Sequence, residues 1–317
     1  MLDLLKNKTF FKLVCGAGNE DLESIKKLVY IYAKAGCKVF DLSAKKEVLE
    51  SAKEGARLAK AKDVHYCVSV GIKGDPHISK AGVNGVNGSA CIKCGNCARS
   101  CPNSAIFPPN IIDEKKCIGC GICAKKCPTG AIKMYEKDIN VKEILPHLVQ
   151  NGAEILELHI MGHDKADLDY KWDIINSCQT ELSSICIDRE NFGNKEVIER
   201  IKYMIAERKP YTTIIQADGV PMSGGCDDYK TTLQAVAMAE VIQNANLPVY
   251  ITLSGGTNSK TMELCHKCNL YPNGVAIGSF ARKIVKQYLD LPDFWENSEA
   301  KNKAVALAKE LMKSNYC

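Results

Sequence analysis

Two runs of cysteine carry the clearest chemistry in this sequence. Each run has the spacing C-x2-C-x2-C-x3-C and is followed at once by proline, first over residues 91–102 and again over residues 117–128. The second run lies 26 residues after the first, and the 16-residue segments that begin at Cys91 and Cys117 agree at ten positions. One tight loop at this spacing can direct three thiolates at three irons of a single iron–sulfur cube. The repeat therefore predicts a duplicated cluster-binding unit.

The duplicated unit resembles a bacterial-type ferredoxin with two [4Fe-4S] clusters. In such ferredoxins the fourth cysteine of each run ligates the cluster of the other run. The resemblance therefore implies two crossed ligand sets. These are Cys91, Cys94, Cys97 and Cys127 for cluster 1, and Cys117, Cys120, Cys123 and Cys101 for cluster 2.

Structural zinc and a disulfide framework are the alternatives for these cysteines. Structural zinc usually takes two separated pairs of ligands, which would leave half of each run without a role. The chain has 17 cysteines in 317 residues and is 46% hydrophobic, so it can bury a full core without covalent links. The odd count and the spacing both favour clusters over disulfides.

Composition excludes several other classes of protein. The net charge of +5 is spread along the chain and forms no basic run, which gives no support for a nucleic-acid partner. The sequence has no apolar stretch of the length that crosses a bilayer. The N-terminus carries Asp3, Lys6, Lys8 and Lys12, which is not the pattern of a signal peptide. We therefore expect a cytoplasmic protein without a membrane span.

Hydrophobic periodicity predicts strands that alternate with helices on both sides of the cysteine-rich segment. Strands are predicted over 11–16, 38–42, 65–71, 154–161, 182–188, 211–217, 249–253 and 274–277. Eight strand–helix units are the number that closes a barrel, so we predict a (β/α)8 TIM-like barrel interrupted after its third strand. An open doubly wound sheet is the alternative.

This pattern divides the chain into four parts. Residues 1–72 form the first part of the barrel, residues 73–139 the ferredoxin-like insert, residues 140–291 the rest of the barrel, and residues 292–317 a C-terminal helix. The insert would leave from the carboxyl end of the third strand, the end at which barrel enzymes build their sites. The clusters would then lie at the barrel mouth.

Polar residues recur with one parity in the last half of the predicted strands. They are Asp41, Ser43, Ser69, Glu157, His159, Cys186, Asp188, Gln216, Asp218, Thr252 and Ser254. Buried polar groups cost stability unless they are paired or used, so this layer indicates either a ligand-binding floor or a self-satisfied network closed by water. Glu157, His159, Asp188 and Asp218 are the candidate acid–base groups.

Glycine-rich turns follow the last strands and could hold a phosphate, because barrels commonly bind phosphate after strands seven and eight. The candidate residues are Ser254, Gly255, Gly256, Thr257, Asn258, Gly278, Ser279 and Arg282, with residues 223–225 as a third turn. A flavin mononucleotide (FMN) or a sugar phosphate would suit them, while the alternative is that glycine only makes tight turns. His77, beside the insert, is a further candidate site residue, and Cys265 and Cys268 form a C-x-x-C whose role stays open.

Several segments are similar to the cyanobacterial light-dependent period modulator (LdpA-like) family. They are FKLVCGAGNEDL at 11–22, GDPHISKA at 74–81, the cysteine runs, LSGGTNSKT at 253–261 and GVAIGSFARKIV at 274–285. The resemblance implies an iron–sulfur protein that senses cellular redox state and passes it to the circadian clock through a signalling partner. Both cysteine runs are complete here, which favours two cubane clusters.

Three functions follow as hypotheses. The first is electron transfer or redox sensing, in which the insert and an unidentified redox partner exchange electrons with something bound at the barrel mouth. The second is an iron–sulfur flavoenzyme that acts on a small substrate. The third is a regulatory scaffold whose partner binding depends on the clusters.

Overall fold

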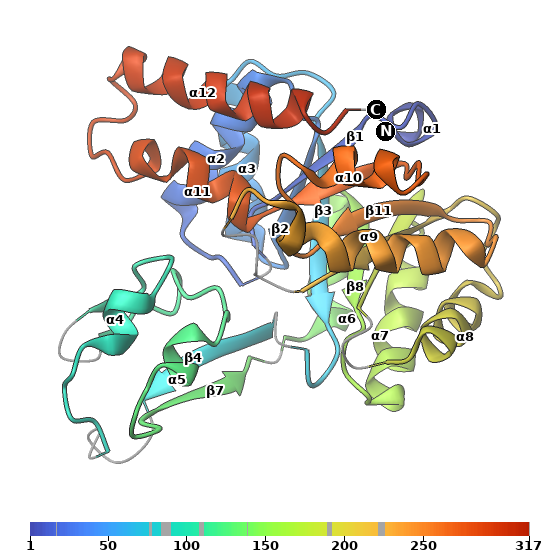
Figure 1. Cartoon of the computed structure of the whole chain (residues 1–317), viewed down its shortest axis with the longest axis horizontal. Helices are drawn as coiled ribbons and strands as arrows, with labels where there is room; N and C mark the ends of the chain where they lie inside the picture. Colours follow the sequence, from blue (N-terminus) through green and yellow to red (C-terminus); the bar gives the residue numbers. More distant parts are fainter. Residues whose placement is uncertain are drawn as a thin grey trace.

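Eight parallel strands close into a barrel at the centre of the molecule (Figure 1). They are β1 (Phe10–Val14), β2 (Val39–Ser43), β3 (His65–Gly71), β8 (Ala153–His159), β9 (Leu182–Ile187), β10 (Thr213–Asp218), β11 (Tyr250–Ser254) and β12 (Gly274–Ile277). Their order around the barrel follows the sequence, and β1 pairs with both β2 and β12. The predicted (β/α)8 barrel is confirmed, and the open sheet is excluded.

The molecule is described by a computed structural model of residues 1–16, 18–75, 78–83, 90–107, 111–137, 139–188, 192–220 and 226–316. The candidate His77 and the turn at residues 223–225 lie outside these described residues. None of the helices in the described part of the chain combines the length and the apolar character that a bilayer crossing requires.

Helices cover the outside of the barrel. They are α2 (Leu22–Ala35), α3 (Lys46–Leu58), α6 (Val141–Gln150), α7 (Lys165–Ser177), α8 (Asn194–Ile205), α9 (Tyr229–Asn244), α10 (Thr261–Lys267), α11 (Ser279–Leu289) and α12 (Ser298–Lys313). α2 shows why these segments are helical: Asp21 accepts a hydrogen bond from the Ser24 amide at 3.2 Å, and Gly36 ends the helix at φ 110°. The last helix, α12, packs on α2 and α11.

Inward-facing residues form layers inside the barrel, because alternate residues of each strand point to the same side. The lowest layer is apolar and contains Phe10, Val39, Cys67, Ile155, Leu182, Ile214 and Tyr250. A short helix, α1 (Leu2–Lys6), packs Leu5 into this layer and closes the amino end of the barrel. The polar residues that the sequence analysis singled out follow two or four positions later along the strands, except Asp188, which follows six positions after Leu182.

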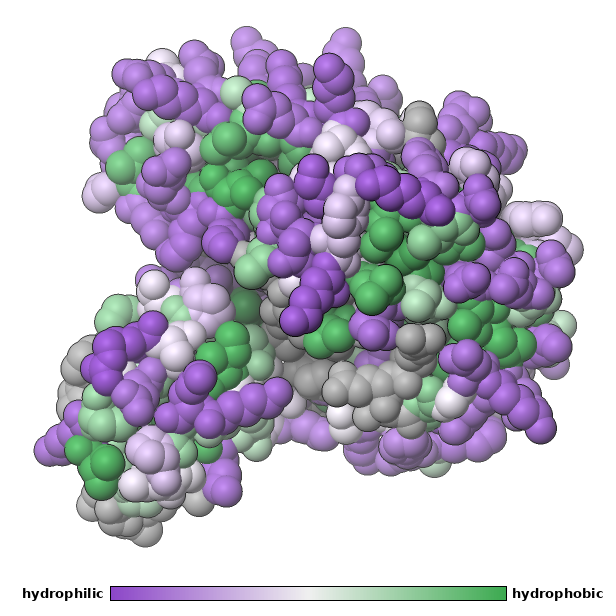
Figure 2. Space-filling model, viewed as in Figure 1, coloured by the Kyte–Doolittle hydropathy of each residue, from purple (hydrophilic) through white to green (hydrophobic). Residues whose placement is uncertain are grey.

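The cysteine-rich insert leaves the barrel after β3 and returns before α6. Its strand β4 (Ser79–Val83) pairs antiparallel with β7 (Ile132–Glu136), and β5 (Ile106–Phe107) pairs with β6 (Ile111–Ile112). Two short helices, α4 (Asn96–Ser100) and α5 (Ile122–Lys125), follow the first part of each cysteine run. The insert projects as a lobe from one side of the barrel (Figure 1), and a surface indentation separates part of this lobe from the rest of the molecule (Figure 2).

Candidate iron–sulfur centre and barrel interior

Four cysteine side chains line one hollow in the insert. Three of them, Cys91, Cys94 and Cys97, come from the first run, and the fourth, Cys127, comes from the second. The rest of the wall is largely apolar and includes Ile92, Ala98, Ile106, Phe107, Ala131 and Ile132. The structure thus places the last cysteine of the second run beside the first three cysteines of the first run.

The second run also has a cysteine of the other run beside it, namely Cys101. Burial raises the pKa of the Cys120 thiol and raises that of Cys123 to about 11, and the nearby Cys101 and Cys117 add to both shifts. Cys101, the last cysteine of the first run, therefore lies near Cys120 and Cys123 of the second run. The short pairing of β5 with β6 and the packing of α4 against α5 bring the two halves of the repeat together.

Backbone amides donate hydrogen bonds to the sulfurs at equivalent places in the repeat. The Ala105 amide lies 3.2 Å from Cys101 Sγ, and the Ala131 amide lies 3.2 Å from Cys127 Sγ. Such bonds favour the thiolate, which is the form that binds metal. At Cys127, slight burial would raise the pKa of the thiol, but the backbone hydrogen bonds and the Thr129 hydroxyl outweigh this effect. The pKa of Cys127 is therefore lowered.

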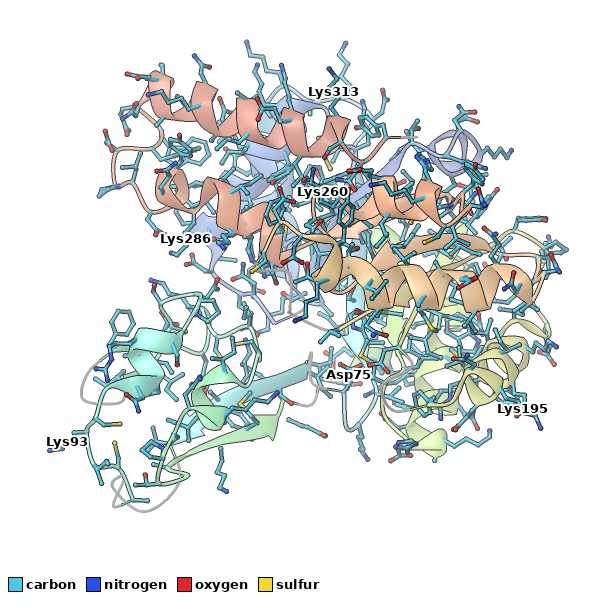
Figure 3. The ribbon with its side chains drawn as sticks, viewed as in Figure 1. Asp75, Lys93, Lys195, Lys260, Lys286 and Lys313 are labelled. Atoms are coloured by element: carbon cyan, nitrogen blue, oxygen red, sulfur yellow. The ribbon has the colours of Figure 1, made fainter. Side chains whose placement is uncertain are left out.

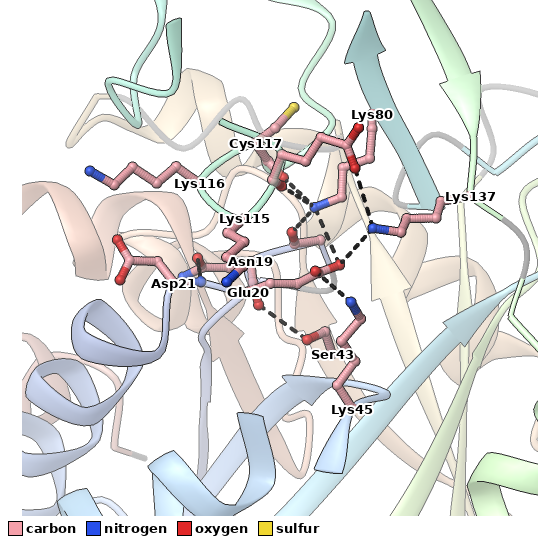
Figure 4. A network of polar contacts seen from close by, with 12 residues as sticks. Asn19, Glu20, Asp21, Ser43, Lys45, Lys80, Lys115, Lys116, Cys117 and Lys137 are labelled. Atoms are coloured by element: carbon pink, nitrogen blue, oxygen red, sulfur yellow. Dashed lines mark hydrogen bonds and ion pairs between the residues drawn. The ribbon is translucent and has the colours of Figure 1, made fainter. Parts of the chain in front are cut away.

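A buried lysine ties the second cysteine run to the barrel (Figure 4). Lys80 of β4 donates to the Cys117 carbonyl at 2.7 Å, to the Glu114 carbonyl at 2.9 Å and to the carbonyl of Gly18, in the loop after β1. Glu20 of the same barrel loop lies 3.6 Å from the Lys80 ammonium. One ammonium group thus joins the start of the second run to the barrel mouth.

Other contacts reinforce this junction. The Glu20 amide donates to the Lys115 carbonyl at 2.8 Å, and Lys45 and Lys137 lie 2.6 Å and 3.8 Å from the Glu20 carboxylate. A Cβ added at Gly18 would lie only 3.3 Å from the backbone of Ile118, between Cys117 and Cys120. The barrel loop and the second run are therefore in close backbone contact.

The first cysteine run lies at the other end of the lobe. Lys93, between Cys91 and Cys94, is at the edge of the insert farthest from the barrel (Figure 3). Its neighbour Ile92 is 64% exposed, and Phe107 and Ile111 are also exposed large apolar side chains. The two cysteine sites therefore differ in place: an outer site that faces solvent and an inner site against the barrel.

Inside the barrel, a lysine and a glutamate form the centre of a polar layer. Lys12 Nζ lies 2.6 Å from Glu157 Oε2 and 3.6 Å from Asp41 Oδ2, and all three side chains are buried. Ser69 donates to Asp41 and also to Glu157 Oε1 at 3.4 Å, and Ser184 donates to Glu157 Oε2 at 2.5 Å. Every Glu157 oxygen thus has several partners.

Burial and the neighbouring charges set the ionisation of this layer. Burial alone would raise the pKa of Glu157, but Lys12 and His159 outweigh it and hold the pKa well below its ordinary value. Burial lowers the pKa of Lys12, but Asp41, Cys67 and Glu157 together raise it by more, so the pKa lies above its ordinary value. The pKa of Asp41 is raised, chiefly by burial. Lys12 and Glu157 therefore form a buried ion pair.

Two further candidate acid–base residues, His159 and Asp218, come from the next inward positions of β8 and β10, beyond this pair. His159 Nε2 is 3.1 Å from Glu157 Oε1, and the Cys186 thiol donates to Asp218 Oδ2 at 3.2 Å. Gln216 Nε2 contacts one member of each of these two pairs, at 3.1 Å from Glu157 Oε1 and 3.3 Å from Cys186 Sγ. Asp188 is buried directly after β9.

The candidate phosphate residues have several internal contacts. Arg282 donates to the carbonyls of Val14 and Cys15, Thr257 donates to the Ala276 carbonyl, and Asn258 donates to carbonyls in the segment before α9. Gly255 has φ +67° and leaves no room for a Cβ against Asp218. Ser254, Gly256, Gly278 and Ser279 belong to the same two turns.

Arg282 also links the barrel to the inner cysteine site. It is partly buried, desolvation lowers its pKa, and Cys15, Cys120 and Tyr32 oppose that effect. Its guanidinium group therefore lies near a cysteine of the second run. This neighbour of the inner site was predicted only as a phosphate ligand.

Two family models match this chain, one over the second part of the barrel and one over the cysteine runs. The model of the light dependent period A C-terminal domain matches residues 147–314, just over half of the chain. The chain belongs to this family. The model of the 4Fe-4S binding domain matches residues 85–107 and 110–133, which cover the two cysteine runs. The chain is thus an iron–sulfur protein with two 4Fe-4S binding motifs.

One relative and two solved structures illustrate the similarity. Light dependent period A of Synechococcus elongatus is 29% identical over 91% of this chain and 84% of its own length. A truncated 3-deoxy-D-arabino-heptulosonate 7-phosphate synthase from Thermotoga maritima is 12% identical, with a TM-score of 0.46 over 96% of this chain and 84% of its own. A tryptophan synthase from M. tuberculosis is 8% identical, with a TM-score of 0.49 over 98% and 94% of the two chains.

Two functional residues escaped the sequence analysis. Lys12 has the inward parity of β1, since it lies between Phe10 and Val14, but a lysine in an apolar strand was noted only as an interruption of a signal peptide. Strand parity alone could have placed it inside the barrel. Lys80 had no such signal, because its role depends on how the insert docks on the barrel.

Proposed function

We propose that the insert binds its two [4Fe-4S] clusters through crossed ligand sets. Cys91, Cys94, Cys97 and Cys127 would hold the outer cluster, and Cys117, Cys120, Cys123 and Cys101 would hold the inner one. Three observations support this: the hollow that joins Cys127 to the first run, the reciprocal position of Cys101, and the amide bonds to both fourth cysteines.

We further propose that the chain uses this pair for electron transfer or redox sensing at the barrel mouth. Bound clusters of this kind supply one-electron redox chemistry. The observation that carries the proposal is the Lys80 ammonium, which contacts the Cys117 carbonyl of the inner site and the Gly18 carbonyl of the barrel. The outer site is open to solvent near Lys93, where a redox partner can approach.

Electrostatics explains how the barrel would respond to the inner site. Arg282 is a partly buried cation near Cys120, Lys80 is a buried cation beside Cys117, and both also contact the loop after β1. A change of one unit of charge at the inner site acts strongly on such groups because the surroundings are poorly polarisable. A redox event would therefore shift the contacts of this loop, which could be read by a signalling partner of the clock type.

A second candidate function is an iron–sulfur flavoenzyme. The turns after β11 and β12 would hold the phosphate of FMN or of a substrate, with Glu157, His159, Asp188 and Asp218 as acid–base groups above Lys12. What favours it is the buried polar layer below those turns. The internal bonds of Thr257, Asn258 and Arg282 leave Ser254, Gly255, Gly256, Gly278 and Ser279 as the phosphate contacts.

Anaerobic purification with quantification of iron, sulfide and flavin tests both functions. Two intact clusters predict about eight irons and eight sulfides per chain. A bound flavin in stoichiometric amount would favour the flavoenzyme, and its absence would favour redox sensing. An iron count near one with zinc in the cysteine sites would contradict both proposals.

A further inference from the structure

Three different metal-binding side chains meet in the upper half of the barrel, away from the cysteine runs. Glu157 and His159 lie two residues apart on β8 and so point to the same side, while Cys186 on β9 is paired in register with His159. Their ligand atoms all lie within 4.8 Å of one another, and each residue is at most 4% exposed. A carboxylate, an imidazole and a thiol thus converge from two adjacent strands.

The spacing of these donors suits one small cation. Zinc binds carboxylate oxygen and imidazole nitrogen at about 2.0–2.1 Å and thiolate at about 2.3 Å, which puts neighbouring donors about 3.3–3.7 Å apart in a tetrahedron. His159 Nε2 and Glu157 Oε1 are already 3.1 Å apart. The other Glu157 oxygen is held by Lys12 at 2.6 Å and by Ser184 at 2.5 Å, which orients the carboxylate.

Gln216 gives an independent sign of a ligand site. Its amide nitrogen touches Glu157 Oε1 and Cys186 Sγ, two of the three donors. Its amide oxygen is buried and accepts no hydrogen bond from any residue that the structure describes. The hydroxyl of Thr252, on the neighbouring β11, is buried and without a partner in the same set of residues. Polar atoms in this condition are rare unless water, an ion or a ligand satisfies them.

We propose that Glu157, His159 and Cys186 bind a single divalent transition-metal ion of the zinc type. Three protein ligands leave the fourth position of a tetrahedron for water or for a small oxygen-bearing ligand. The Cys186 thiol gives up its proton to the solvent when it binds the ion, so binding adds one positive charge to the interior. That interior already holds Asp41, Glu157 and Asp218 beside Lys12, so it attracts a cation.

Lys12 and Ser184 act as positioning residues for this site. They occupy Glu157 Oε2 and leave Oε1 toward His159 and Gln216. The site does not depend on the clusters, because none of its ligands belongs to the cysteine runs.

Zinc retention by the cluster-loaded full chain tests the proposal. The protein is purified anaerobically, incubated with zinc, passed through a desalting column with a weak chelator, and analysed for zinc, iron and sulfide in one sample. The expected result is about one zinc per chain with sulfide unchanged. Cys186→Ser and His159→Asn should each lower the affinity for zinc at least tenfold. Cys178→Ser and His147→Asn, outside the barrel interior, should leave it unchanged.

X-ray absorption at the zinc edge of the wild-type protein decides the matter even if a variant fails to fold. One sulfur at about 2.3 Å with nitrogen and oxygen at about 2.0–2.1 Å supports the site. Four sulfur neighbours, or zinc gained as sulfide is lost, would place the ion in the cysteine runs and overturn the proposal. Failure to retain zinc, or equal retention by folded Cys186→Ser and His159→Asn, would also overturn it.

Discussion

The last cysteines of the two runs in the insert and two cysteines of the barrel differ in their exposure and in their hydrogen bonds. In the insert, Cys101 and Cys127 are partly exposed, and backbone amides donate to their sulfurs. In the barrel, Cys15 and Cys37 are buried, and burial raises the pKa of each thiol well above its ordinary value. At Cys127 the bonds from the backbone and from Thr129 lower the pKa of the thiol, whereas at these two barrel cysteines burial favours the neutral thiol.

The difference shows that local hydrogen bonds and burial set how readily each cysteine loses its proton. The insert has almost no apolar core of its own, and its small core includes Cys117 and Cys123. The barrel has a large core between strands and helices that is complete without metal. The insert should therefore depend on its clusters for structure, while the barrel should not.

Paired cysteine substitutions should have the largest effect, and they test which cysteines share a cluster. With crossed ligands, Cys94→Ser with Cys127→Ser removes two ligands of one cluster and should leave about four irons per chain. Cys94→Ser with Cys101→Ser removes one ligand from each cluster and should lose most of both. Iron and sulfide analysis, with electron paramagnetic resonance of the reduced protein, measures the result.

The matched control is Cys178→Ser, whose side chain lies outside both cluster sites and should retain about eight irons. Uncrossed ligand sets would give the reverse order for the two pairs. That reversal would contradict the assignment of Cys101 and Cys127.

Removal of Lys12 should destabilise the barrel and leave the insert intact. Lys12→Met leaves Glu157 buried without its ammonium partner, which costs about 3–5 kcal/mol. Urea unfolding followed by tryptophan fluorescence measures the loss, and the iron content should not change. Lys267→Met, at an exposed ion pair on α10, should have little effect. Equal stability of the Lys12 variant and the wild type would refute the buried ion pair.

Lys80 allows the junction between the two regions to be weakened selectively. Lys80→Met removes the donor to three carbonyl groups and should cost about 1–3 kcal/mol. Lys133→Met, at an exposed position of β7, should cost less than about 0.5 kcal/mol. Limited proteolysis should then release the insert faster from the Lys80 variant alone. Identical cleavage rates in the two variants would argue against a Lys80 tether.

Arg282 should affect only the inner cluster. Arg282→Met removes a partly buried positive charge near Cys120, so reduction becomes harder and the midpoint potential should fall by an amount on the order of tens of millivolts. Lys93→Met, at the exposed outer site, should shift a potential much less because water screens its charge. A redox titration monitored by electron paramagnetic resonance compares them. A larger shift of the midpoint potential in the Lys93 variant would contradict the assignment of the inner and outer sites.

Acid should weaken the barrel through Glu157. Its pKa in the folded chain is lower than in the unfolded chain, so it adds stability above its ordinary pKa of about 4.3 that is lost as the pH falls. Asp41, with its raised pKa, acts in the opposite sense. Glu157→Gln should therefore make the free energy of unfolding depend less steeply on pH between about 5 and 3. Circular dichroism measures this slope, and an unchanged slope would exclude an ionised Glu157.

Repetition and period made much of the fold predictable. The cysteine repeat located the insert, and the strand–helix alternation indicated eight units. Strand parity also placed Glu157 and His159 in a buried polar layer. These features are local, since each depends on residues a few positions apart.

Long-range packing explains what the sequence did not show. Helix α1 is five residues long, too short for a periodic signal, and forms because Leu5 fills the lower end of the barrel. The role of Lys80 depends on a carbonyl 62 residues away, and that of Arg282 on carbonyls 267 and 268 residues away. Only the closed barrel and the docked insert bring these groups together.

Hydrogen exchange on the oxidised and the reduced protein tests the coupling of the inner cluster to the barrel mouth most directly. Reduction should change exchange at Cys15 and Gly16, over residues 18–21 and at the start of α11, as well as around Cys117. The amino end of the barrel, near α1, should not change. Changes confined to the insert would contradict the proposal that the barrel responds to the redox state.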